Sequence, residues 1–195
     1  AALIDRKIAL SSLGVDSERI SMAKSLSLRD LCAGLKDVSP ILSGLRSIKE
    51  DSEVKLIRRA CAITDEIMSA VIESWSGFQT EADVASFIEM KARKSGLPCP
   101  FHTIVASGKN ASDPHHRATT AKLMQGPVII DFGVCFNGYC SDITRTVCIG
   151  PPSDEVRKTY EMVRKTQDLA ISNVNPGIAC VDLDAIARGS MGKHA

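Results

Sequence analysis

The chain has 195 residues, of which 44% are apolar and 24% charged, and its formal net charge is +1. This length and composition suit a globular chain with one substantial core. The near-neutral charge gives no electrostatic case for nucleic acid or a membrane surface, and we expect neither as a partner. Asp5 and Arg6 interrupt the opening where a signal peptide needs its apolar centre, so we do not expect secretion.

The first 45 residues predict one short helix. Apolar residues between Ile20 and Leu35 recur at helical spacing, and Val38-Ser39-Pro40 predicts a break after them. A domain boundary is expected near residues 40–50.

Two longer helices follow. The first runs from Lys49 to Trp75, and its apolar residues recur at spacings of three, four or seven, which predicts a buried stripe. That stripe comprises Val54, Ile57, Cys61, Met68, Val71 and Trp75. The second begins at Thr80-Glu81-Ala82-Asp83, an acidic variant of the capping box, and ends at Gly96. Its inward residues are predicted to be Val84, Phe87 and Ile88.

A strand is predicted over residues 101–106, followed by a loop over residues 108–125 that carries His115. After a hairpin over residues 127–149, Pro151-Pro152-Ser153 opens a third helix that extends to about Asn173. Asn175-Pro176-Gly177 ends that helix, and a further helix begins at Asp182.

The hairpin is the most informative segment. Asn137-Gly138 between two β-rich runs predicts a two-residue type I′ turn, so that Phe136 faces Tyr139 and Cys135 faces Cys140. Side chains alternate between the two faces of a strand. One face therefore carries Asp131, Gly133, Cys135, Cys140, Asp142 and Thr144, and the other carries Val128, Ile130, Phe132, Val134, Ile143 and Val147.

The second of these faces is apolar and predicts a core, whereas the first carries acids that a strand normally avoids. Asp131 lies opposite Thr144 and diagonal to Asp142, which places the Cβ atoms of the two acids roughly 7–8 Å apart or less. Carboxylates at this separation can reach one divalent ion, or two ions about 3.5–4 Å apart. Gly133 opposite Asp142 leaves room for an ion or a substrate. The pattern also fits two solvated acids on an exposed hairpin.

The surrounding residues resemble the signature of the pita-bread metallopeptidases, family M24, which includes methionine aminopeptidase, Xaa-Pro aminopeptidase, proline dipeptidase and creatinase. Residues 107–116 (SGKNASDPHH) resemble the family segment with a histidine after a proline. Residues 139–146 (YCSDITRT) match the form typical of the prolyl-peptide branch. The resemblance covers roughly residues 45–188. It implies an α+β pita-bread fold, of which this chain holds the N-terminal half: an antiparallel hairpin and its covering helices.

The resemblance also implies roles for individual residues. Asp131 and Asp142 look like carboxylate ligands of two divalent metal ions, with manganese favoured and cobalt or zinc as alternatives. His115 looks catalytic, because the family histidine hydrogen-bonds the substrate or the tetrahedral intermediate without binding metal. The ions activate water and polarise the scissile carbonyl, and the imidazole steadies the developing oxyanion. His116 has no implied role and is expected to be an ordinary surface or loop histidine.

The family's remaining ligands, a histidine in a Gly-His-Gly-like segment and two glutamates, have no counterpart in this sequence. His194 lacks that glycine-rich context, and we do not assign it as a ligand. A stable catalytic site generally needs three or more protein ligands. We therefore expect this chain by itself to be inactive, or far less active than a complete enzyme.

By the same resemblance, residues 1–45 look like the C-terminal remnant of a creatinase-like N-terminal domain, and residues 46–195 like an incomplete catalytic domain. The implied function is a metal-dependent exopeptidase that cleaves Xaa-Pro bonds at peptide N-termini. Its substrate would be a peptide with proline at the second position. The alternative is a non-catalytic peptide- or protein-binding module on the same scaffold. Half of such a fold leaves an apolar sheet face uncovered, which allows a homodimer.

Seven cysteines are scattered without a CxxC pair, which indicates reduced thiols and a cytoplasmic location. Cys135 and Cys140 are the exception, because residues directly opposite could form a disulfide or bind zinc. We interpret this pair as two small, buried apolar residues. A third function, a zinc-binding structural domain, would use Cys135, Cys140 and Cys148.

Overall fold

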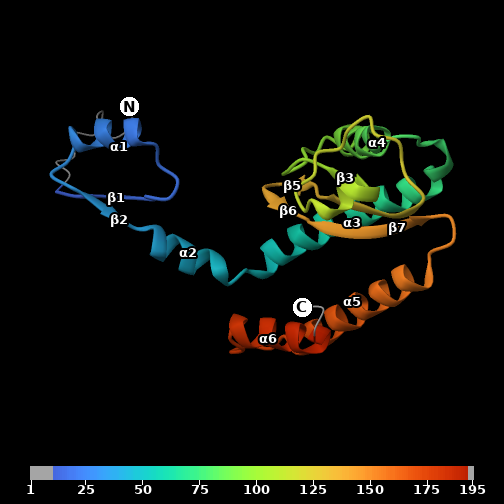
Figure 1. Cartoon of the computed structure of the whole chain (residues 1–195). Helices are drawn as coiled ribbons and strands as arrows, with labels where there is room; N and C mark the ends of the chain where they lie inside the picture. Colours follow the sequence, from blue (N-terminus) through green and yellow to red (C-terminus); the bar gives the residue numbers. More distant parts are fainter. Residues whose placement is uncertain (1–10, 193–195) are drawn as a thin grey trace. The chain divides into compact units, whose positions relative to one another are not determined.

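The computed structural model describes residues 11–192 and divides the chain into two compact units, residues 1–55 and residues 56–195. The first unit contains β1 (Leu13–Val15), α1 (Met22–Arg29), β2 (Leu35–Asp37) and α2 (Ser39–Ser47) (Figure 1). β1 and β2 form a parallel pair. His194, which we did not assign as a ligand, lies outside the described residues.

The helix predicted over residues 20–35 is too long. Ser21 caps its start by accepting a hydrogen bond from the Lys24 N–H, and the helix ends at Arg29. The chain then turns so that Leu35 pairs with Leu13. The break predicted at Val38-Ser39-Pro40 lies where α2 begins, and Pro40 is in the first turn of that helix, where its missing N–H removes no helical hydrogen bond.

Helix α3 (Asp51–Glu73) begins in the last residues of the first unit, and most of it belongs to the second unit. The elements that follow are η1 (Trp75–Gly77), α4 (Glu81–Lys94), β3 (Ile104–Ser107), η2 (Gly108–Ser112), β4 (Gly126–Phe132), β5 (Cys135–Phe136), β6 (Tyr139–Cys140), β7 (Ile143–Ile149), α5 (Asp154–Ser172) and α6 (Cys180–Met191). The α+β class is confirmed. No helix among residues 11–192 is both long and apolar enough to cross a membrane.

The sheet is antiparallel, with strand order β3-β4-β7, and the β5-β6 pair forms the tip of the hairpin. The predicted register is confirmed: Asp131 pairs with Thr144, and Cys135 pairs with Cys140. Asn137 and Gly138 have φ angles of 49° and 86°, the two positive values that a type I′ turn requires. The predicted core face of the hairpin is also confirmed, because its β4 residues are fully buried.

The core lies between this face of the sheet and helices α3 and α4 (Figure 1). From the sheet it takes Val105, Val128, Ile130, Phe132 and Val134, and from α4 it takes Val84, Ala85, Ile88 and Ala92. From α3 it takes Ala60, Ile63, Ile67, Met68 and Val71. The predicted stripe on α3 is therefore right only in its later turns, because Val54, Ile57 and Cys61 precede or flank the core and are partly exposed.

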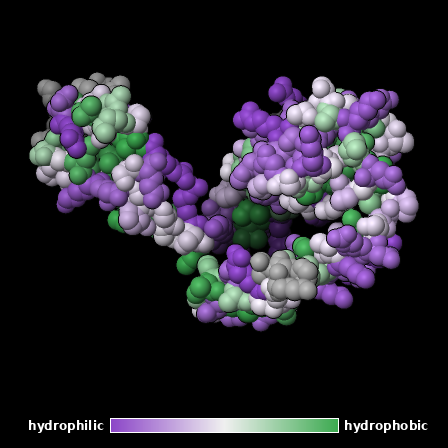
Figure 2. Space-filling model, viewed as in Figure 1, coloured by the Kyte–Doolittle hydropathy of each residue, from purple (hydrophilic) through white to green (hydrophobic). Residues whose placement is uncertain are grey.

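Much of the exposed apolar surface of the second unit lies on helices rather than on the sheet. Side chains on α5, on α6 and on their connection are exposed, and green patches mark this region in Figure 2. They are Tyr160, Val163, Leu169, Ile171, Val174 and Val181. On the outer face of the sheet, Thr144 and Thr146 are exposed, so that face is more polar than we expected.

The hairpin is distorted where β4 and β7 give way to β5 and β6. The Val134 N–H donates to Ser141 Oγ at 3.0 Å, so the side chain of Ser141 takes the place of a backbone acceptor. The Ser141 carbonyl oxygen then comes so close to Gly133 that a Cβ atom there would lie 1.9 Å from it. Only glycine fits at this position.

We predict that Gly133→Ala lowers the free energy of unfolding by at least about 2 kcal/mol, because the added methyl would meet backbone that cannot rotate away. Urea unfolding followed by circular dichroism measures the change. Gly77→Ala is the matched control, since no atom lies within 4 Å of the Cβ it would add. Equal effects of the two substitutions would contradict the steric argument.

Candidate metal-binding and catalytic site

The structure brings the two predicted metal-binding acids together. Asp131 lies near the end of β4, and Asp142 lies in the short link between β6 and β7. The Asp142 carboxyl is within hydrogen-bonding reach of the Asp131 carboxyl. The Thr144 side chain also hydrogen-bonds to the Asp131 carboxyl. Among the described residues, Asp131 Oδ1 is buried and has no hydrogen-bond partner.

The electrostatics of this pair are unfavourable without a cation. Burial raises the pKa of Asp131, and the negative charge of Asp142 raises it further, whereas the hydrogen bond from Thr144 only partly opposes them. A buried carboxylate oxygen without a donor, next to a second carboxylate, is the donor set that a hard divalent ion prefers. The residues present therefore fit a metal ion.

The pair does not complete a metal site. Within residues 11–192, no group of three or more histidine, cysteine or acidic side chains is placed to hold an ion. Further ligands would have to come from outside this part of the chain.

His115 lies on the exposed loop between η2 and β4. Its backbone N–H donates to Asp113 Oδ1 at 2.9 Å, which closes a tight turn after η2. In the described part of the chain, no hydrogen bond or ion pair joins the His115 ring to Asp131 or Asp142. The structure thus brings the two acids together, but among the described residues it does not join His115 to them by a hydrogen bond.

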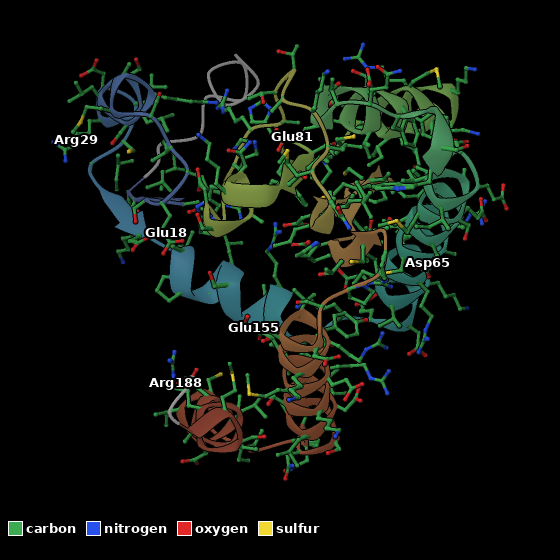
Figure 3. The ribbon with its side chains drawn as sticks, turned by 45° about the vertical axis from the view of Figure 1, so that its right-hand side comes forward. Glu18, Arg29, Asp65, Glu81, Glu155 and Arg188 are labelled. Carbon is green, nitrogen blue, oxygen red and sulfur yellow. The ribbon has the colours of Figure 1, made fainter. Side chains whose placement is uncertain are left out.

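The loop that carries His115 is held by a buried glutamate that the sequence analysis missed as a functional residue. Glu81 opens α4, and its side chain is completely buried among the yellow-green segments of Figure 3. Its Oε1 accepts hydrogen bonds from the Ser107 N–H at 3.0 Å and from Asn110 Nδ2 at 2.9 Å. Its Oε2 accepts from Thr119, through the N–H at 3.2 Å and the hydroxyl at 3.0 Å.

His116 completes this network, and our expectation of an ordinary surface or loop histidine is wrong. Its Nε2 lies 2.8 Å from Glu81 Oε2, and its side chain is only 13% exposed. The reason is that an unpaired buried carboxylate is very costly, so several donors from the loop and its borders bond to Glu81. No local signal could have found this role, because an acid in the first turn of a helix usually faces solvent and interacts with the helix dipole.

Ser141 anchors the hairpin from the other side. It is 2% exposed, and its hydroxyl forms a hydrogen bond with the Thr64 hydroxyl of α3. The residue next to Asp142 is thereby fixed to the core. Its neighbour in the sequence, Asp142, is exposed on the opposite side.

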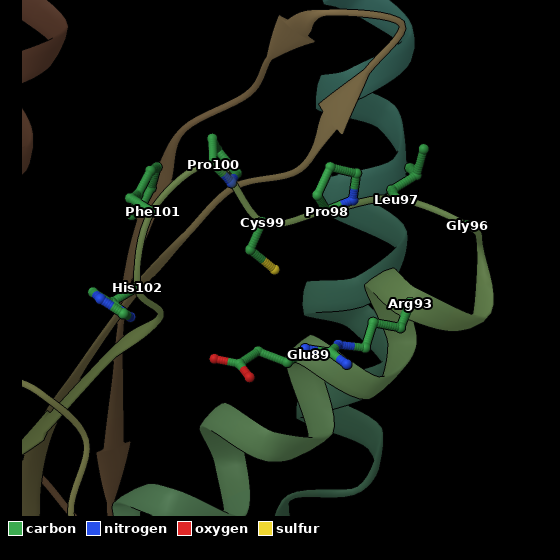
Figure 4. A pocket seen from close by; sticks show the side chains of 9 residues that line it. All are labelled: Glu89, Arg93, Gly96, Leu97, Pro98, Cys99, Pro100, Phe101 and His102. Atoms are coloured by element: carbon green, nitrogen blue, oxygen red, sulfur yellow. The ribbon is translucent and has the colours of Figure 1, made fainter.

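A separate hollow of about 980 Å³ lies between the end of α4 and residues 96–102 (Figure 4). Glu89 and Arg93 of α4 line it on one side, and Cys99, Phe101 and His102 line it on the other. Neither Asp131 nor Asp142 lines this hollow, so it is not the site formed by the two carboxylates.

Comparison with known proteins agrees with this geometry. The sequence model of metallopeptidase family M24 matches residues 55–195. The chain is 33% identical over 188 residues to an Xaa-Pro dipeptidase of Pyrococcus horikoshii, covering 95% of this chain and 54% of that protein. It therefore spans about half the length of this curated relative.

Solved structures show the same extent of similarity. An X-Pro aminopeptidase from Thermotoga maritima superposes with a TM-score of 0.88 at 29% identity, over 97% of this chain and 55% of that chain. The prolidase from Pyrococcus furiosus gives a TM-score of 0.86 at 30% identity, over 97% of this chain and 57% of that chain. These structures have the pita-bread fold, and this chain has an incomplete version of it. The chain belongs to metallopeptidase family M24.

We predict that Glu81 makes the fold sensitive to acid. Burial alone would raise its pKa, but the hydrogen bonds from Asn110 and His116, with those from Ser107 and Thr119, lower it from its ordinary 4.5 to about 2. A lowered pKa stabilises the fold above pH 4.5, and this contribution is lost as the pH falls from about 4.5 toward 2. Glu81→Gln should remove that part of the pH dependence and cost on the order of 3 kcal/mol at pH 7.

Urea unfolding of the two proteins between pH 7 and pH 2.5 measures this effect. Glu73→Gln is the control, because Glu73 is exposed at the end of α3. If the stability of the Glu81→Gln variant fell with acid as steeply as that of the parent chain, another group would be responsible.

We predict that the charged form of Asp131 destabilises the fold, whereas the charged form of Glu81 stabilises it. Because the pKa of Asp131 is raised in the fold, the charged form destabilises the metal-free protein above the pKa of the unfolded chain. Asp131→Asn should therefore stabilise the metal-free protein at pH 7, and the gain should vanish below about pH 4, near the ordinary pKa of aspartate. Thermal unfolding in the presence of a chelator measures it. A variant less stable than the parent at pH 7 would rule out the unfavourable pair.

Proposed function

We propose that the protein is a metal-dependent exopeptidase that cleaves Xaa-Pro bonds at peptide N-termini. The observation that carries the proposal is the pair formed by Asp131 and Asp142, with a buried carboxylate oxygen that has no donor within residues 11–192. The names of the relatives, Xaa-Pro dipeptidase and X-Pro aminopeptidase, support the preference for proline. A peptide with proline at the second position is the proposed substrate.

In this proposal Asp131 and Asp142 hold two divalent ions, manganese first and cobalt or zinc as alternatives. Bound divalent ions would supply Lewis-acid activation of the scissile carbonyl and of a water nucleophile. Two charged carboxylates suit this task, because their mutual repulsion in the metal-free protein is relieved when a cation lies between them. Thr144, which contacts Asp131, orients that carboxylate.

His115 is the proposed catalytic side chain. Its role is to donate a hydrogen bond to the oxygen on which negative charge develops as the carbonyl is attacked. The buried network around Glu81 orders the backbone on both sides of His115, through Asn110 before it and His116 and Thr119 after it. A fixed backbone limits the positions that the imidazole can take up, which favours the reacting geometry.

Two ligands bind a divalent ion weakly, so the chain alone is proposed to hydrolyse peptides slowly or not at all. Full activity would require the histidine and the two glutamates that the family resemblance implies, and the chain covers 54% of one relative and 57% of another. The cytoplasmic location and the homodimer expected from the sequence both remain predictions.

The second candidate is a non-catalytic module that binds peptides or proteins on the same scaffold. It is favoured by the absence of a third metal ligand among residues 11–192. The same observation gives no support to a zinc-binding structural domain built from Cys135, Cys140 and Cys148. The carboxylate pair distinguishes the two remaining functions, because a binding module has no need for a strained acidic pair.

We predict that manganese stabilises the chain and that Asp142→Asn abolishes this effect. An ion that binds only the folded state adds about 2.7 kcal/mol when its concentration is 100 times the dissociation constant. The measurement is the unfolding temperature with increasing manganese, cobalt or zinc, with a chelator as the blank. Asp168→Asn, an exposed substitution on α5, is the control and should respond like the parent chain.

The same proteins should be tested for release of the N-terminal residue from an Xaa-Pro-Xaa peptide. Slow, chelator-sensitive release that disappears in Asp142→Asn would support the peptidase. Manganese stabilisation that persists unchanged in Asp142→Asn would exclude the proposed ligand. Peptide binding without metal stabilisation or hydrolysis would favour the binding module.

A further inference from the structure

The tip of the hairpin places two thiols directly opposite each other. Cys135 of β5 pairs with Cys140 of β6. The Cys135 N–H does not point at Cys140 but donates to the Pro98 carbonyl at 2.9 Å, and Figure 4 shows Pro98 beside the hairpin. The next pair, Ser141 and Val134, is joined by a backbone hydrogen bond of 2.9 Å. The two cysteines therefore form a non-hydrogen-bonded pair of the antiparallel ladder.

In a non-hydrogen-bonded pair the side chains lie closer together than in a hydrogen-bonded pair. The Cα atoms of a non-hydrogen-bonded pair lie about 4.5 Å apart, and disulfides span Cα separations of about 4.4–6.8 Å. The two thiols already lie within hydrogen-bonding contact. The turn that joins them is closed by Asn137 and Gly138 in left-handed conformations, so the strands are held in register without further adjustment. A covalent bond between the sulfurs requires little movement of the backbone.

The two cysteines also differ in access to solvent. Cys140 is exposed, whereas Cys135 is partly buried beneath the segment that contains Pro98. An oxidant in solution reaches the first more readily than the second. This difference in exposure is the arrangement expected of an attacking thiol and a resolving thiol.

We propose that Cys135 and Cys140 are a modification site, at which a hydroperoxide oxidises the two thiols to a reversible disulfide across the hairpin. The proposal does not rest on the peptidase function, because it requires neither metal nor substrate. It replaces our interpretation of the pair as two small, buried apolar residues, because Cys140 is exposed.

The chemistry balances in two steps. The Cys140 sulfur attacks one oxygen of hydrogen peroxide, the O–O bond breaks, and one water leaves with the thiol proton, which yields a sulfenic acid. The Cys135 sulfur then attacks the oxidised sulfur, the S–O bond breaks, and a second water leaves. Two thiols lose two electrons in total, and the peroxide is reduced to two waters. Added dithiothreitol reverses the oxidation by thiol–disulfide exchange.

The product has a defined place in the molecule, because Cys140 and Asp142 are two residues apart on the same face of the hairpin. Oxidation converts the two thiols into one disulfide and joins β5 to β6, two positions before Asp142.

The experiment treats the full chain with a small excess of hydrogen peroxide at pH 8, at low protein concentration. We expect the number of titratable thiols to fall from seven to five, the intact mass to fall by about 2 Da for the two hydrogens lost, and dithiothreitol to restore both values. Peptide mapping without reduction should recover one linked peptide that contains Cys135 and Cys140. Manganese stabilisation is measured separately, so its failure would count against the metal site and not against the disulfide.

Cys135→Ser is the decisive variant. Its Cys140 should stop at the sulfenic acid, which a dimedone probe labels, and no linked peptide should form at the hairpin. Cys180→Ser, which removes an exposed cysteine of α6, is the matched control and should still lose two thiols. Overoxidation of Cys140 beside a free Cys135 in the parent chain, or disulfides that join only other cysteines, would overturn the proposal.

Discussion

The close approach of the Ser141 carbonyl to Gly133 is the constraint on which the candidate site depends. A regular ladder would leave both acids on a flat strand surface. Here the Ser141 hydroxyl accepts a hydrogen bond from the Val134 N–H and is also hydrogen-bonded to the Thr64 hydroxyl of α3. The hairpin is therefore pinned to the core at the residue before Asp142. Because the register around this point is continuous, Asp131 and Asp142 meet on the opposite side.

The carboxylate pair illustrates a compromise between folding and function. Hydrophobic residues at positions 131 and 142 would satisfy a sheet better than two acids that repel each other. The fold tolerates the pair because the second face of the same strands contributes the central part of the core, from Val128 to Val134. The stability given up at the site is small beside the burial that the strands provide, which is typical of functional sites.

Much of this arrangement could be predicted from the sequence, and the reasons are local. Asn137-Gly138 sets the phase of the whole hairpin, so the partners of Asp131 and Cys135 followed by counting in steps of two. The helices α3 and α4 were predicted because they are long and periodic. The parallel pair β1-β2 was missed, because three-residue strands carry no periodic signal and pair across twenty-two positions of sequence, as Leu13 does with Leu35. Glu81 and His116 were missed for the same reason, since their partners come from distant segments.

The network around Glu81 also bears on how the second unit folds. Its partners lie 26 to 38 positions away in the sequence, so the loops that join them must close before any of these bonds can form. A charged side chain cannot leave water until donors are available to it. Helix α4 can therefore form early with Glu81 in solvent, whereas the carboxylate turns inward only when β3 and the loop have arrived. We therefore expect the loop that carries His115 to become ordered late in folding.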